Sequence, residues 1–122
     1  MTDPAPLRAA RLARLRAAMA AAGHEALLLT TAGAVRYATG AVPLHGDSSV
    51  EAAYPFAAVV GARDLQVLGI EPGFVPAGVA AAPWPRDPVA AYADLLAGAR
   101  RVGVDRLPMA TGLALARALP GV

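Results

Sequence analysis

The sequence predicts an α/β fold, a single domain with a mixed β-sheet that has a central hairpin and helices packed on it. Two observations carry this prediction. Short apolar runs bounded by turn residues, typical of buried strands, alternate with stretches of helical periodicity along the 122 residues. Two of these runs, 56–60 and 65–70, are separated by a Gly-Ala-Arg-Asp connection of hairpin length.

The N-terminal part of the chain predicts a helix followed by a strand. Apolar residues recur at helical spacing from Leu12 to Ala22, which predicts a helix over residues 6–22 that ends at Gly23. The run at 25–30 is short, apolar and flanked by helix breakers, so we expect a buried strand there.

A second, short helix is predicted directly after this strand. Thr31 is the expected N-cap of a helix over 32–39, and Gly40 is its expected C-terminal cap. Residues 41–54 follow as a loop, the longest predicted connection in the chain.

The second half of the chain predicts the remaining elements beyond the hairpin. A short strand is expected at 79–82, and the pair Asp87 and Pro88 is typical of a helix start. Residues 101–105 predict another strand, and 108–119 a final helix. The predicted order is therefore α-β-α-β-β-β-α-β-α.

The composition excludes several function classes. The chain has no Cys, which excludes disulfides, thiolate nucleophiles and Cys-based zinc sites. Its eleven basic residues are all Arg, but the net charge is only +2, so we expect no nucleic-acid partner. No apolar stretch is long enough for a membrane span and no signal peptide is visible, so we expect no membrane partner and a cytoplasmic location.

Four arginines gather in the first predicted helix, namely Arg8, Arg11, Arg14 and Arg16. On a helical wheel they scatter around the apolar residues and form no single stripe, so they are expected to be solvated flanks. A nucleic-acid accessory domain that uses this helix is a weaker alternative.

The turn after the first strand offers little for phosphate binding. Gly33 is the only glycine between residues 30 and 35, and no Gly-rich fingerprint or P-loop Lys accompanies it. A structural turn is the favoured interpretation. The alternative function that we keep is a free-standing α/β module that binds a small anion at Thr31–Ala34.

The histidines do not form a metal or catalytic site by spacing. His24 and Glu25 resemble the start of a zincin motif, but position 28 is Leu where the second His would be needed. His45, Asp47 and Ser48 are the residue types of a hydrolase triad, but they crowd into one loop, whereas triad members normally come from separate parts of a fold.

The order of the motifs carries a family resemblance. The stretch from Arg11 to Gly40, the hairpin and the segment from Arg100 to Gly121 together resemble the N-terminal domain of the creatinase/prolidase family. Residues 35–41 read V-R-Y-A-T-G-A, close to the V-R-Y-L-T-G-F of that family. Ala34, Ala38 and Ala41 depart from the family's usual Asn, Leu and aromatic residue. The 41–54 loop does not match the creatine-binding segment of creatinases.

The resemblance implies a division of labour. In such proteins catalysis belongs to a C-terminal domain with two Asp, one His and two Glu around a pair of divalent metals. Residues 1–122 are then one non-catalytic N-terminal domain, cut before its last strand and before that catalytic domain. This chain alone is expected to hold no metal or other cofactor.

The resemblance also implies partners and a functional surface. The expected partners are the protein's own catalytic domain and further copies in a homo-oligomer of a Xaa-Pro peptidase-like or creatinase-like metallohydrolase. The domain would contribute to oligomerisation and to the edge of the substrate pocket. The candidate residues for the pocket or the interface are Arg36, Tyr37, His45, Asp47 and Ser48.

Overall fold

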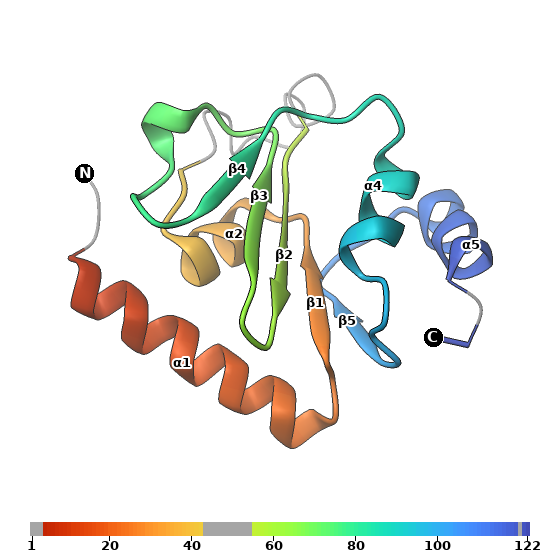
Figure 1. Cartoon of the computed structure of the whole chain (residues 1–122), viewed down its shortest axis with the longest axis horizontal. Helices are drawn as coiled ribbons and strands as arrows, with labels where there is room; N and C mark the ends of the chain where they lie inside the picture. The colour runs from red at the N-terminus through yellow and green to blue at the C-terminus, as the bar shows by residue number, and fades with distance from the viewer. Residues whose placement is uncertain (1–3, 43–54, 120) are drawn as a thin grey trace.

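One mixed β-sheet organises the fold (Figure 1). The computed structural model of the chain describes residues 4–42, 55–119 and 121–122. The strands within these residues are β1 (Ala26–Leu29), β2 (Ala57–Gly61), β3 (Leu65–Leu68), β4 (Ala80–Ala82) and β5 (Val102–Val104). They form a five-stranded sheet in the order β4-β3-β2-β1-β5.

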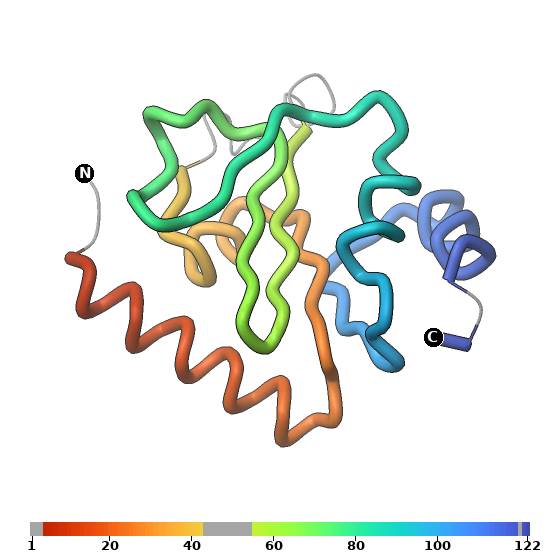
Figure 2. Tube along the Cα trace, in the orientation of Figure 1, coloured from red at the N-terminus to blue at the C-terminus, as the bar shows by residue number. Residues whose placement is uncertain are grey.

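The strand directions confirm a mixed sheet with a hairpin in its middle. β2 pairs antiparallel with β1 and with β3, while β1 pairs parallel with β5 and β3 parallel with β4. β1, β3, β4 and β5 therefore share one direction, and β2 runs against them. Figure 2 shows β1 and β5, from opposite ends of the chain, lying next to each other.

Helices cover both faces of this sheet. Those in the described residues are α1 (Ala5–Ala22), α2 (Ala32–Thr39), α4 (Pro88–Leu95) and α5 (Met109–Ala118), with a 3-10 turn η1 (Pro72–Phe74). α1 and α2 pack on one face, and α4 and α5 on the other. Within the described residues the predicted order of helices and strands is confirmed, with η1 as an addition. The predicted loop over 41–54 lies outside the described residues from residue 43 onward.

Two apolar cores result because successive strand residues point to opposite faces. Leu29 of β1 joins the first core, together with Met19 of α1 and Val35 of α2. Leu28, its neighbour in the strand, joins the second core with Leu96. A strand that is buried on both faces reads as a continuous apolar run, which is how β1 appears in the sequence.

The helix ends follow from local chemistry. Gly23 and Gly40 both take the left-handed conformation, with φ of 78° and 74°, and cap α1 and α2 as predicted. The Asp87 carboxylate accepts from the Ala90 amide at 3.1 Å, so the predicted N-cap of α4 is confirmed. Ala22, expected on the apolar face of α1, is exposed because the helix ends there.

The expectation that all four arginines of α1 are solvated flanks is wrong for Arg8, Arg11 and Arg16, which are half-buried. The Arg16 Nε donates to the Gly61 carbonyl and its Nη2 to the Asp64 carbonyl, both at 2.9 Å. The guanidinium thereby ties α1 to the turn of the β2–β3 hairpin. Arg14, in contrast, is exposed as expected.

The third strand is shorter than the predicted run 65–70. β3 ends at Leu68 because Gly69 has a φ of 79° and its amide turns to donate to the Ala82 carbonyl. A Cβ at Gly69 would overlap the Pro55 carbonyl oxygen and lie 3.1 Å from the Trp84 ring. The close approach of these segments therefore requires glycine at this position.

Candidate functional site

α2 presents Arg36 and Tyr37 to solvent because its opposite side is buried. Val35, Ala38 and Thr39 face the core, and the 100° step of a helix then leaves residues 36 and 37 outside. Tyr37 keeps 41% of its surface exposed, which is high for an aromatic side chain. Two of the predicted site residues are thus displayed on one helix face.

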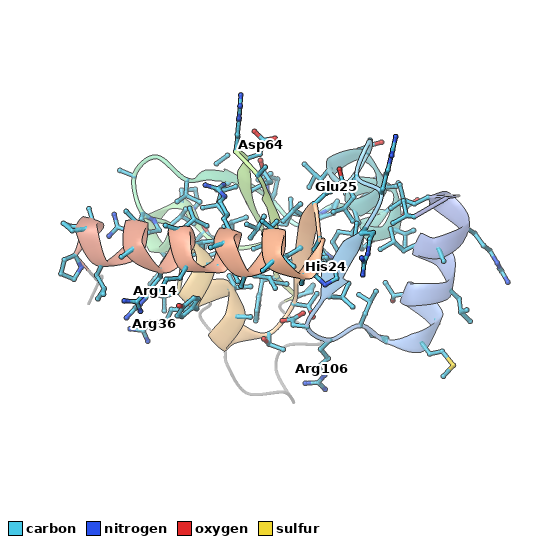
Figure 3. All side chains as sticks on the ribbon, turned by 90° about the horizontal axis from the view of Figure 1, so that it is seen from below. Arg14, His24, Glu25, Arg36, Asp64 and Arg106 are labelled. Carbon is cyan, nitrogen blue, oxygen red and sulfur yellow. The ribbon has the colours of Figure 1, made fainter. Side chains whose placement is uncertain are left out.

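Arginines of α1 flank this face. The Arg11 Cζ atom lies 5.8 Å from the centroid of the Tyr37 ring, within cation–π range. Arg14 lies one turn further along α1, and in Figure 3 it projects on the same side of the molecule as Arg36. We call Arg11, Arg14, Arg36 and Tyr37 the arginine face.

Hydrogen bonds hold the C-terminal end of α2, directly after Arg36 and Tyr37. The Thr39 hydroxyl donates to the Val35 carbonyl at 2.7 Å and accepts from the Ala41 amide at 3.0 Å. The Gly40 amide donates to the Arg36 carbonyl at 2.8 Å. These bonds hold the backbone that carries Arg36 and Tyr37 in one conformation.

The side chains of the arginine face are of types suited to binding. Guanidinium groups bind carboxylates or phosphates, and an exposed Tyr adds a ring and a hydroxyl. None of these side chains is a general base or an activated nucleophile near neutral pH. The other predicted site residues, His45, Asp47 and Ser48, lie outside the described residues, so the structure brings together only Arg36 and Tyr37.

The N-terminus of α2 holds an anion that belongs to the chain itself. The Asp105 carboxylate accepts from the Thr30 and Thr31 amides, each at 2.9 Å. The Thr31 hydroxyl donates to the same carboxylate at 2.7 Å. Thr31 is therefore at the predicted N-cap position, but its side chain bonds to Asp105 and makes no cap bond within α2.

This arrangement weakens the small-anion alternative. A helix N-terminus attracts anions through its free amides, and Asp105 already supplies a carboxylate beside Thr31. Asp105 was not among the predicted site residues. Its signal in the sequence was an Asp at the end of the predicted strand 101–105, since the ends of parallel strands meet at one edge of a sheet.

His24 lies between α1 and β1, and its Nδ1 atom is buried without a hydrogen-bond partner among the described residues. His24 is not part of a group of metal-binding side chains among the described residues. Within the ranges that the structure describes, no group of three or more His, Asp or Glu side chains is placed to hold a metal ion. In the same ranges, no helix is both long and apolar enough to cross a membrane.

Comparison with known proteins gives a family match and several similar structures. The family model of the creatinase/prolidase N-terminal domain matches residues 11–122. Comparison with curated protein sequences gives no match. Among solved structures, the N-terminal domain of cytoplasmic peptidase PepQ from Mycobacterium tuberculosis H37Rv is 25% identical, with a TM-score of 0.68 over 92% of this chain and 86% of that one.

Two longer peptidases share the fold. Dipeptidase PepE from Mycobacterium ulcerans is 25% identical with a TM-score of 0.64, over 98% of this chain and 34% of that one. The Xaa-Pro dipeptidase from Bacillus anthracis is 16% identical with a TM-score of 0.69, over 93% of this chain and 32% of that one. The chain thus spans about a third of the length of these two enzymes. Because the family model covers nearly the whole chain, the chain belongs to the creatinase/prolidase N-terminal domain family.

Proposed function

We propose that this chain is the non-catalytic N-terminal domain of a Xaa-Pro peptidase-like or creatinase-like metallohydrolase, where it contributes to oligomerisation and to the edge of the substrate pocket. The observation that carries the proposal is the family match over residues 11–122. It is supported by neighbours named as a Xaa-Pro dipeptidase and a dipeptidase, each about three times as long as this chain.

The arginine face is the surface that we assign to this role. It offers exposed guanidinium groups beside a partly exposed ring, a combination that is enriched where proteins bind one another. A substrate or a neighbouring subunit that presents a carboxylate would pair with Arg14 or Arg36. His45, Asp47 and Ser48 complete the proposed surface by sequence.

The metal chemistry of the parent belongs, in this proposal, to a separate catalytic domain. Among the described residues, no group of three or more His, Asp or Glu side chains is placed to hold a metal ion. The partners are accordingly the protein's own catalytic domain and other copies of the same protein. The proposed location is cytoplasmic, as in the name of the PepQ neighbour.

The proposal is tested in the protein that the complete gene encodes. We expect its coding sequence to continue past Val122 into a domain with the Asp-Asp-His-Glu-Glu metal set. In that protein, Arg36→Ala combined with Tyr37→Ala should lower kcat/KM about tenfold or shift the oligomer toward smaller species. His45→Ala combined with Asp47→Ala, and Ser48→Ala alone, extend the test to the other candidates.

Arg117→Ala provides the matched control, because Arg117 is exposed on α5 and far along the chain from the arginine face. It should leave kinetics and assembly unchanged. The melting temperature of the isolated domain should change little in all of these variants, since the substituted side chains of α2 are exposed. Normal kinetics and normal assembly in every variant would remove the arginine face from the functional surface.

A further inference from the structure

The sheet has a topological switch point between β1 and β5. These strands are parallel neighbours, yet β1 leads into α2 on the face of the first core and β5 leads toward α5 on the face of the second. Where adjacent parallel strands send their connections to opposite faces, a crevice opens at their carboxyl ends, and ligands of open α/β sheets bind there.

A groove lies at this edge. It has a volume of about 370 Å³, within the usual range of small-molecule sites. Its walls are mainly apolar and come from distant segments, with Phe56 before β2, Trp84 before α4 and Leu107 after β5. The Trp84 and Tyr92 rings meet edge to face, with centroids 6.3 Å apart. We call this the switch-point groove.

A buried tyrosine supplies a polar group to the groove. Tyr92 is only 3% exposed, and it lines the groove. Its hydroxyl has no hydrogen-bond partner among the described residues. The hydroxyl still reaches solvent, whereas His24 Nδ1 does not. A buried Tyr usually finds such a partner. Burial raises the pKa of Tyr92, so the hydroxyl stays protonated and can donate.

The charge at the groove is positive. Among the described residues that line it, Arg106 is the charged one. Its side chain projects away from the body of the molecule (Figure 3). The neighbouring Asp105 does not line the groove, because its oxygens are bonded to Thr30, Thr31 and the Arg106 amide. An anionic group is therefore favoured at the mouth and an apolar body inside.

We propose that the switch-point groove binds a small carboxylate that carries an apolar ring. The ring packs against Trp84 and Tyr92, a polar atom of the ligand accepts from the Tyr92 hydroxyl, and the carboxylate meets Arg106 at the rim. This site is independent of the arginine face and of the proposed role in a larger enzyme.

The test uses the only tryptophan of the chain, Trp84, as a reporter inside the groove. We expect 3-phenylpropionate to change the Trp84 fluorescence of the 122-residue protein in a saturable manner, with a Kd of about 1 mM or below, as is usual for a ligand of this size. The neutral analogue 3-phenylpropan-1-ol should bind more weakly, because it lacks the carboxylate.

Two variants separate the contacts. Arg106→Gln should weaken binding of the carboxylate about threefold to fivefold and leave the alcohol unaffected, while Arg117→Gln changes neither. Tyr92→Phe, which keeps the buried ring, should weaken the ligand about threefold to tenfold. Arg106→Gln preserves the backbone amide and carbonyl that bond to Asp105 and Thr30, so the variant is expected to stay folded.

The proposal is overturned if the fluorescence change rises linearly without saturation, or if both variants bind the probe as the parent does. Amide NMR shifts give a second readout that does not depend on the variants. Shifts caused by the probe should gather at residues 84, 92 and 106–111, and shifts elsewhere would equally overturn the site. Because the isolated domain is used, a failure here leaves the proposed function standing.

Discussion

Asp105 joins two parts of the chain that are 75 residues apart. Its partial burial by itself would raise the pKa of the carboxyl group. The bonds from the Thr31 hydroxyl, from the Thr31 and Thr30 amides and from the Arg106 amide outweigh that effect, and the pKa is lowered below its ordinary value. Folding therefore favours the ionised form of this side chain, and the stability of the domain becomes dependent on pH.

We expect Asp105→Ala to lower the free energy of unfolding by about 1–3 kcal/mol at neutral pH, because four donors lose a charged acceptor. A group with a lowered folded pKa adds stability above its unfolded pKa, near 3.8 here, and loses it as pH falls through the folded value. Urea titrations from pH 7 downward should thus show parent and variant converging at acidic pH.

Asp94→Ala is the control for this experiment, since Asp94 is exposed on α4. It should unfold like the parent at every pH. A difference between parent and Asp105→Ala that persists unchanged down to the lowest pH would show that the carboxylate charge is not what stabilises the junction.

At the scale of elements, the two glycines of α2 and its C-terminal cap differ in backbone angle and in the space available for a side chain. Gly40 has a positive φ, and a Cβ there would overlap the Arg8 side chain and lie 3.0 Å from Pro76. Gly33 lies in the first turn, has ordinary helical backbone angles, and a Cβ there would meet nothing within 4 Å. The same substitution therefore has opposite consequences at the two positions.

Gly40→Ala should destabilise the domain by about 1–3 kcal/mol, from the left-handed backbone and from the crowding at Pro76. Gly33→Ala should stabilise it by about 0.5–1 kcal/mol, because alanine loses less conformational entropy in a helix. Thermal and chemical unfolding of both variants measures this pair. Equal shifts of the same sign would mean that the conformation of α2 differs from the one described.

The features that could be predicted from the sequence are those that depend on residues close together along the chain. Gly23, Gly40 and Asp87 act at their own helix ends, and the hairpin follows from a short connection between two apolar runs. Arg16 and Asp105 escaped prediction because the groups they bind are 45 and about 75 residues away. Burial of β1 on both faces was visible in its composition, but its parallel partner was not.

The candidate functional residues likewise include some that were predicted from the sequence and some that were not. Arg36 and Tyr37 were predicted from a family motif, and helical periodicity explains why both are exposed. The switch-point groove escaped prediction because Phe56, Trp84, Tyr92 and Arg106 come from four separate segments. The pairing of all five strands is needed to bring these segments together at one end of the sheet.

At the scale of the whole molecule, two cores on opposite faces of one sheet account for most of the apolar side chains that the structure describes. Each face has its own pair of helices. The described residues contain no group of three or more His, Asp or Glu side chains placed to hold a metal ion.

We expect the purified 122-residue protein to hydrolyse neither Xaa-Pro peptides nor creatine. We also expect it to bind no stoichiometric Mn, Co or Zn, because the proposed function assigns both catalysis and metal binding to another domain. Peptidase assays across the purification and metal analysis after dialysis check this prediction. Activity that follows the protein through every step, or metal near one equivalent, would contradict it.

The two faces of the sheet are covered at different times while the chain is being synthesised. The first core draws on residues no later than Val79, so it can close early. The second core waits for α4 and α5, which leave the ribosome after every residue of the first core. Until then Leu28 and Val59 leave an apolar sheet face uncovered, and transiently exposed apolar surface of this kind promotes aggregation. The final third of the chain therefore decides whether the nascent sheet is shielded or adheres to other apolar surfaces.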